Sequence, residues 1–229
     1  MKKKVIILIS IISIVVIGII FCLIFNKKNN YNVNGFTCHI GHEEYKTSIG
    51  VIIDNETVQE YNKIIEELEE LEDGYEKYFN LALNYRNLDD LDNACLYVLK
   101  SISFNEKYLA YSMLGTIYEE REDYLQSEKA FLRALSLNNQ HINTYKKLGS
   151  LYYIKMRKYP DAMYKYYVDA IKITNYNLEL TKHYASYLER INDIEYAINV
   201  WNGILGEEGE SEVINNKILE LEKKLEEQS

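Results

Sequence analysis

The sequence predicts an all-α protein, an α-solenoid of helix-turn-helix repeats that follows one N-terminal transmembrane helix. Three observations predict this fold class. Residues 5–25 form an uncharged apolar run, small residues recur beyond residue 74 at a spacing of about 34 residues, and the whole chain holds one Pro and ten Gly. Because Pro and Gly interrupt helices, their scarcity is typical of long helices joined by short turns.

The first element is the apolar run from Val5 to Phe25. At about 1.5 Å per residue, a helix of this length reaches across the roughly 30 Å hydrocarbon core of a bilayer. A cleaved signal peptide would end at a small residue, and a lipoprotein signal would have one before its cysteine, whereas Phe21 precedes Cys22 here. We therefore expect a retained anchor, with residues 1–4 as its basic flank.

Lysines on the two sides of this run predict its orientation. Lys2, Lys3, Lys4 and the terminal amine precede it, and Lys27 and Lys28 follow it. Positive charge is enriched on the cytoplasmic side of membrane proteins, so the N-terminus is expected in the cytoplasm. The protein would then be a single-pass membrane protein whose soluble domain lies outside the cytoplasm.

The soluble part is acidic. Residues 1–29 hold five Lys and no acid, so removing their five positive charges from the net charge of −9 leaves −14 on the remaining 200 residues. Nucleic-acid binders need a basic surface that displaces phosphate counterions, and no basic stripe is present. A DNA or RNA partner is therefore not expected.

Between the anchor and the repeats, residues 26–55 show neither helical periodicity nor clean alternation, and we interpret them as a juxtamembrane linker. Residues 56–73 predict a leading amphipathic helix, because apolar residues recur every three or four positions and Gly74 stands where a helix would stop. Its apolar positions are Val58, Tyr61, Ile65, Leu68 and Leu71.

Beyond Gly74 the chain repeats itself. A small residue preceded and followed by bulky ones recurs at Ala82, Gly115, Gly149 and Ala185. A second small residue follows twelve or thirteen positions later, at Ala94, Ser127, Ala162 and Ala197. Small residues at facing positions let two helices approach closely, so each unit predicts a pair of helices.

The unit from Tyr111 to Asn139 resembles a tetratricopeptide repeat. Its framework positions carry the residue types of that motif: Tyr111, Leu114, Gly115, Tyr118, Ser127, Phe131 and Ala134. The resemblance implies a right-handed α-solenoid with repeats at 74–107, 108–141 and 142–177 and a degenerate fourth repeat at 178–210. The apolar face of residues 211–229 predicts one more helix, which caps the stack. Extra residues near Lys158-Tyr159-Pro160 lengthen the third unit, which is also similar to the related Sel1-like repeats.

The resemblance implies a function in binding. The first helices of such repeats line a concave groove that holds a peptide or protein segment, so the chain is expected to be a membrane-anchored scaffold or adaptor for a membrane-associated protein partner, with no enzymatic activity and no cofactor. The implied groove positions are Phe79, Leu83, Arg86, Ser112, Thr116, Glu119, Lys146, Ser150, Tyr153, Lys182, Ser186 and Glu189. The carboxylate clamp of the family is missing, since Phe79 and Leu83 stand where its polar residues would begin.

An alternative function would use Cys38, His39 and His42, whose thiolate and imidazole groups are zinc ligands. Their spacing is not a usual chelating pattern and no second cluster completes a tetrahedral site, so a metal-binding or small hydrolytic protein is the weaker hypothesis. Cys38 and Cys95 could also pair as a disulfide, which the sequence leaves open.

Overall fold

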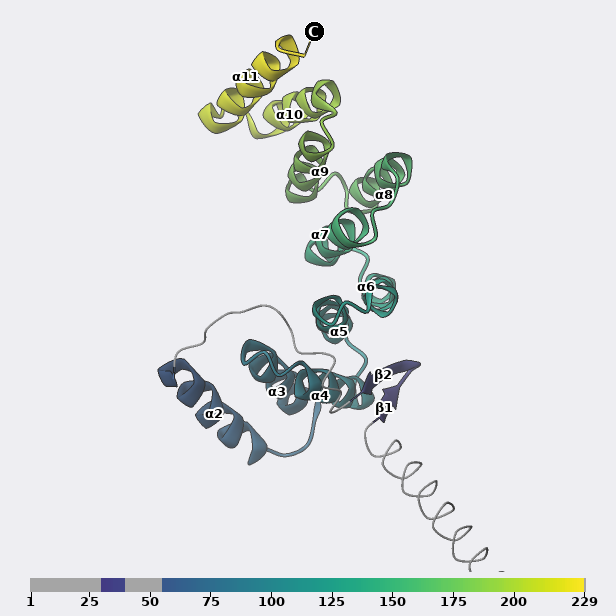
Figure 1. Ribbon diagram of the computed structural model, residues 1–229, viewed down its shortest axis with the longest axis vertical. Coiled ribbons are helices and arrows are strands. Elements are labelled where there is room, and N and C mark those ends of the chain that lie inside the picture. The colour runs from purple at the N-terminus through teal and green to yellow at the C-terminus, as the bar shows by residue number, and fades with distance from the viewer. Residues whose placement is uncertain (1–29, 40–54, 229) are drawn as a thin grey trace, which may run out of the picture. The chain divides into compact units, whose positions relative to one another are not determined.

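The computed structural model describes residues 30–39 and 55–228 (Figure 1). The predicted transmembrane segment, residues 5–25, lies outside this part of the chain. No helix within the described ranges is long and apolar enough to cross a membrane. These ranges contain a β-hairpin followed by ten α-helices, an all-α helical-repeat solenoid to which one two-stranded sheet is added.

The helices follow one another in pairs joined by short turns. After the leading helix α2 (Asn55–Glu69), the pairs are α3 (Tyr75–Asn87) with α4 (Leu91–Phe104), α5 (Tyr108–Glu120) with α6 (Tyr124–Leu137), α7 (Ile142–Ser150) with α8 (Pro160–Ile173), and α9 (Leu178–Arg190) with α10 (Ile194–Glu208). A π-helix, η2 (Leu151–Lys155), continues α7, and α11 (Glu212–Glu226) ends the series.

The turns within three of these pairs share one local design, a residue with positive φ followed by an aspartate that caps the second helix. The pairs of residues are Asp89–Asp90, Glu122–Asp123 and Asn192–Asp193. Each aspartate accepts a hydrogen bond from the backbone N–H three residues on, which satisfies a donor that the helix leaves free. Such a cap contributes about 1 kcal/mol.

The described part of the chain forms two compact units that divide within α6, between Ala130 and Phe131. We call them the N-terminal unit and the C-terminal unit. In the N-terminal unit, Ala82 of α3 and Ala94 of α4 are fully buried, as are Leu81 and Leu99 beside them. Small side chains at these positions allow close packing of α3 on α4.

The N-terminal unit also contains an antiparallel β-hairpin, which corrects the expectation of a linker without regular structure. Strand β1 (Asn30–Val33) pairs with β2 (Phe36–His39) through a two-residue turn at Asn34 and Gly35. Both turn residues have positive φ, 52° and 79°, as a type I′ turn requires. The Asn-Gly dipeptide is a strong local signal for a hairpin and has no part in helical periodicity.

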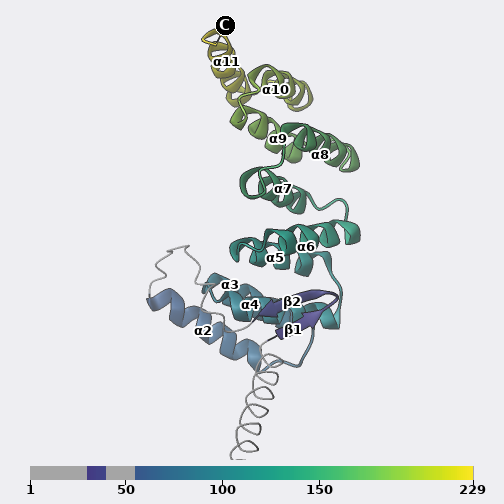
Figure 2. The same cartoon turned by 45° about the vertical axis from the view of Figure 1, so that its right-hand side comes forward.

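The hairpin is fastened to α4 and α5 by a disulfide and by aromatic packing, and it lies beside α4 in both views (Figures 1 and 2). Cys38 is bonded to Cys95 of α4, with a Cα–Cα distance of 5.8 Å. Phe36 is 3% exposed and stacks on the ring of Tyr118. The Tyr118 hydroxyl donates a 2.9 Å hydrogen bond to the carbonyl oxygen of Thr37. Cys38 and Cys95 therefore do pair as a disulfide, which the sequence left open.

At the other end of the chain, α11 lies beside α10 (Figure 2). One apolar face of α11 makes the contact. Ile214, Ile218 and Leu221 are buried, and the first two join Ile204 of α10 in one cluster. Ser211 caps α11 by accepting a hydrogen bond from the backbone N–H of Ile214. The remaining positions of α11 are mostly charged and exposed, as the last element of a helical stack requires.

Candidate functional site

The predicted groove positions all lie on the first helix of a pair or on its continuation. Phe79, Leu83 and Arg86 lie on α3, Ser112, Thr116 and Glu119 on α5, Lys146 and Ser150 on α7, Tyr153 on η2, and Lys182, Ser186 and Glu189 on α9. Their surroundings differ greatly between the two units.

In the N-terminal unit most of these side chains are engaged within the protein. Arg86 forms an ion pair with Glu120 through two hydrogen bonds. The ring of Phe79 stacks on that of Tyr75, with centroids 5.4 Å apart. Ser112 and Thr116 are buried, Glu119 is half-buried, and Leu83 is exposed. These residues do not offer a ligand a set of free polar groups.

The charged groove positions of the C-terminal unit are also ion-paired. The pairs are Lys146 with Glu179 at 2.5 Å, Lys182 with Glu208 at 2.5 Å, and Glu189 with Lys217 at 2.8 Å. Glu189 accepts a further hydrogen bond from the indole N–H of Trp201. Ion pairs at a surface contribute little to stability, but here they leave these charges partly neutralised.

Three predicted residues, Ser150, Tyr153 and Ser186, come together around a small cavity between α7, η2 and α9. Residues that the sequence did not indicate complete it, among them Ile154, His183, Tyr187 and Arg190. A second, larger cavity of about 450 Å³ shares Tyr153, Ile154 and Tyr187 with the first and extends to Arg157, Lys158 and Pro160. We call the two adjoining cavities the third-repeat groove.

The extra residues of the third unit create this groove. After Ser150 the helix widens into η2, where the backbone N–H of Met156 donates to the carbonyl oxygen of Leu151, five residues earlier. Arg157 then adopts a positive φ of 49°, and Pro160 begins α8. π-helical turns commonly result from an inserted residue and are frequent at functional sites. The insertion brings Tyr153 and Ile154 to the cavity walls and Arg157 to their edge.

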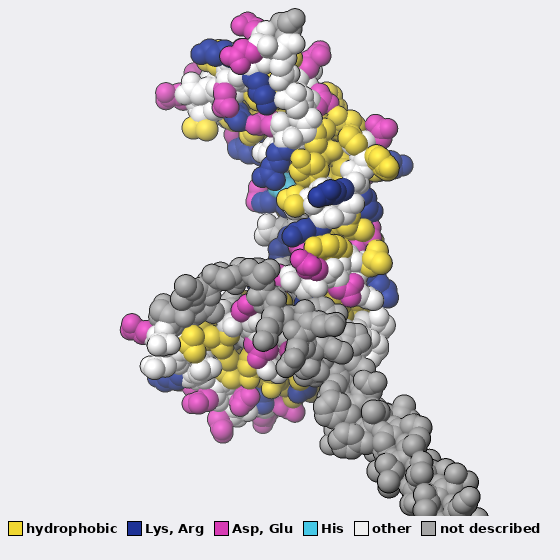
Figure 3. Space-filling model, in the orientation of Figure 1, with side chains coloured by type: hydrophobic (Ala, Val, Ile, Leu, Met, Phe, Trp, Pro, Cys, Tyr) yellow, Lys and Arg dark blue, Asp and Glu magenta, His cyan; other side chains and the backbone are white. Residues whose placement is uncertain are grey.

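The walls of the third-repeat groove are apolar and aromatic, while its edge is cationic. The rings of Tyr153 and Tyr187 meet edge to face at 5.1 Å, and Ile154 is 49% exposed. Arg157 and Arg190 are exposed and form no ion pair with any residue of the described ranges. Figure 3 shows hydrophobic side chains gathered over α8 and α9, with Lys and Arg side chains beside them.

The floor of the groove is polar and uncharged at neutral pH. His183 contacts the Tyr167 hydroxyl through Nδ1 at 3.0 Å and the Ser150 hydroxyl through Nε2 at 3.4 Å. Burial lowers the pKa of His183 below its usual value of 6.5, and Lys146 and Arg190 lower it further. Burial also raises the pKa of Tyr167. A negative ligand would therefore interact with the arginines at the edge and not with a charged histidine below.

The disulfide removes the alternative site. Because Cys38 is bonded to Cys95, it has no thiolate to offer a metal, and His42 lies outside the described residues. Within the part of the chain that the structure describes, no three His, Cys, Asp or Glu side chains gather as a metal site. The Cys38, His39 and His42 hypothesis therefore has no support.

Two of the helix pairs, α3 with α4 and α5 with α6, are similar to tetratricopeptide repeats. The model for the tetratricopeptide repeat matches residues 75–108 and 109–141. No curated protein matches the chain.

Several solved structures are similar to this chain. One described as "Functional Characterization of Pseudomonas Aeruginosa pilF" has a TM-score of 0.52 at 14% identity, over 76% of this chain and 77% of the other. The crystal structure of MamA has a TM-score of 0.50 at 20% identity, over 66% of this chain and 86% of the other. YrrB, described as "a TPR protein with an unusual peptide-binding site", has a TM-score of 0.45 at 20% identity, over 64% and 73%.

Proposed function

We propose that this protein is a membrane-anchored scaffold that binds a segment of a partner protein in the third-repeat groove. The observation that carries the proposal is the juxtaposition of Tyr153, Ile154 and Tyr187 with Arg157 and Arg190 around adjoining cavities. Proteins with tetratricopeptide repeats mediate protein–protein interactions, and the repeats identified here support the same role.

The chemistry of the groove favours a segment with an apolar or aromatic side chain next to an acidic group. An aromatic cavity of about 450 Å³ accommodates one large side chain. Guanidinium groups bind carboxylates through paired hydrogen bonds, and Arg157 and Arg190, unlike Lys146 and Lys182, form no ion pair with another described residue. Neighbouring apolar and cationic surfaces would together fix the register of such a segment.

We further propose that residues 5–25 anchor the protein and that its repeats lie outside the cytoplasm. The apolar length of the run and the lysines before it support this orientation. The Cys38–Cys95 disulfide supports it independently, because disulfides persist in oxidising compartments and are rare in the cytosol. Anchoring would raise the effective concentration of the groove toward partners in the same membrane.

Crosslinking in intact membranes followed by recovery of the full chain tests the proposed binding. A defined partner should be recovered with the natural protein and lost when Arg157→Ala and Arg190→Ala are combined. Lys172→Ala, which removes an exposed charge of α8 outside the groove, is the matched control. Recovery that is equal for both variants would contradict the proposal.

Protease treatment of whole cells tests the orientation separately. Cleavage of the repeats from outside, without lysis, is the expected result. Protection until the membrane is opened would place the repeats in the cytoplasm.

A further inference from the structure

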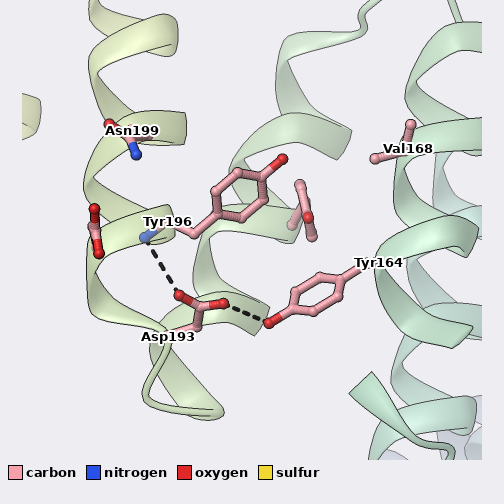
Figure 4. Close-up of a pocket in the computed structure, with 7 residues that line it drawn as sticks. Tyr164, Val168, Asp193, Tyr196 and Asn199 are labelled. Atoms are coloured by element: carbon pink, nitrogen blue, oxygen red, sulfur yellow. Dashed lines mark hydrogen bonds between the residues drawn. The ribbon is translucent and has the colours of Figure 1, made fainter. Parts of the chain in front are cut away.

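A third cavity in the C-terminal unit, separate from the two that form the third-repeat groove, is lined mainly by tyrosines and acidic residues. It has a volume of about 470 Å³ and lies between α8, α9 and α10 (Figure 4). Its lining includes Tyr164, Tyr184, Asp193, Glu195 and Tyr196, none of which lines the groove. We call it the tyrosine cavity.

Its aromatic walls meet at nearly right angles. The ring of Tyr196 is 6.2 Å from that of Tyr164, with an angle of 79° between their planes. It is also 6.2 Å from that of Tyr184, at 75°. Rings in such an arrangement can offer both a face and an edge to one enclosed group, and ring faces attract cations.

Two carboxylates give the cavity a negative charge. Asp193 accepts hydrogen bonds from the Tyr164 hydroxyl and from the backbone N–H of Tyr196, which holds it at the cavity (Figure 4). Glu195 is exposed, and neither carboxylate is ion-paired within the described ranges. The hydrogen bond that the Tyr164 hydroxyl donates to Asp193 is the main reason that the pKa of Tyr164 is raised to about 12, so that this hydroxyl stays protonated.

An unpaired buried group also indicates a ligand. Tyr184 is 3% exposed and lines the cavity, yet among the described residues its hydroxyl has no hydrogen-bond partner of good geometry, the Tyr196 side chain being the neighbouring polar group. Buried polar groups are nearly always hydrogen-bonded in folded proteins. A ligand whose polar end enters the cavity would provide the missing partner.

We propose that the tyrosine cavity binds the positively charged end of a lysine or arginine side chain presented by a partner protein. The ring faces and the two carboxylates attract a cation, and the aromatic walls accept the aliphatic stem that precedes it. The third-repeat groove carries the opposite charge, so the C-terminal unit would recognise both acidic and basic groups. The two sites have separate residues and can be tested separately.

The test measures binding of a fluorescein-labelled Gly-Lys-Gly-Lys-Gly-Lys peptide to the full chain in detergent micelles, by fluorescence anisotropy. The same peptide with Gln in place of Lys is the uncharged comparison. We expect saturable binding of the lysine peptide alone, and about fivefold or greater weakening by Glu195→Gln or Tyr196→Ala. Tyr196→Phe keeps the ring and should bind as the natural protein does.

Matched controls separate a specific site from the general acidity of the chain. Glu222→Gln removes an exposed acid of α11, and Tyr176→Ala removes an exposed tyrosine outside the cavity; both should leave binding unchanged. Equal weakening by Glu195→Gln and Glu222→Gln would overturn the proposal, as would equal binding of the Gln peptide. Combined Arg157→Ala and Arg190→Ala should not weaken binding of the lysine peptide. A failure of the proposal for the third-repeat groove would therefore be distinguishable from a failure of the proposal for the tyrosine cavity.

Discussion

Gly149 of α7 lies so close to Tyr167 of α8 that a Cβ atom on the glycine would be 2.6 Å from the tyrosine hydroxyl oxygen. The same Cβ would be 3.2 Å from a ring carbon of Tyr166. Tyr167 is 1% exposed, and its hydroxyl is hydrogen-bonded to His183 on the floor of the groove. The glycine thus allows α7 and α8 to approach closely, and this approach positions Tyr167 on the floor of the groove.

Gly149→Ala is therefore expected to destabilise the protein. The added methyl group must displace a buried ring that is hydrogen-bonded, and overpacking of this kind costs about 1–3 kcal/mol. Gly203→Ala in α10 is the matched control, because nothing lies within 4 Å of its Cβ position and alanine favours a helix by up to ~1 kcal/mol. Urea unfolding of both variants measures the difference, and a stabilised Gly149→Ala would contradict the close contact.

Removing the disulfide should loosen the hairpin. Cys38 and Cys95 are 57 residues apart, so their bond restricts the unfolded chain strongly. Replacing both with Ser is expected to lower the unfolding free energy by about 2–4 kcal/mol. Dithiothreitol should lower the stability of the natural protein in the same way and leave the double variant unaffected. Equal sensitivity of the two proteins to the reductant would show that another effect is responsible.

Stability should fall in mild acid because of His183. Its folded-state pKa lies below the usual 6.5, so the unfolded chain binds the proton more readily. The stability that this group contributes is complete above about pH 6.5 and is lost as the pH falls below that value. His183→Gln should therefore show a smaller loss between pH 7 and pH 5 in urea unfolding. Burial also lowers the pKa of His141, so some dependence should remain. Identical pH profiles would contradict this assignment.

Salt should weaken partner binding if the arginines act through charge. Arg157 and Arg190 are exposed, and exposed charges interact weakly once ions screen them. For a purified partner, we expect affinity to fall as NaCl rises from 50 to 500 mM, and the slope to be reduced in the combined Arg157→Ala and Arg190→Ala variant. Tyr153→Ala should lower affinity by about tenfold at every salt concentration. An unchanged slope in the arginine variant would argue against a carboxylate ligand.

The repeat class was predictable because its signals are local and recur. Small residues such as Ala82 and Gly115 recur one repeat apart, and Tyr111 stands at an aromatic position of the repeat. The helical-repeat fold is confirmed. The hairpin is not predicted by long periodicity, because its signal is only the dipeptide Asn34-Gly35 in a polar stretch. Its burial also depends on Cys95, which lies far away in the sequence.

The site was predictable only in part. The family resemblance indicated which helix faces to consider, and Ser150, Tyr153 and Ser186 do come together. It could not indicate Arg157 or Ile154, because they lie in or after an inserted π-turn that the regular repeat lacks. The length of the third unit was the available signal. Ion pairs such as Lys146–Glu179 depend on contacts between repeats, which the spacing of one repeat does not reveal.

The most direct test of the central claim is photocrosslinking from the groove in intact cells. A benzoylphenylalanine residue placed at Tyr153 should crosslink to one defined partner protein, and the adduct should disappear when Arg157 and Arg190 are both replaced by Glu. The same probe at Tyr176, which is 72% exposed and outside the groove, should not form this adduct. An adduct at Tyr153 that persists without the arginines, or equal adducts at both positions, would contradict binding in the third-repeat groove.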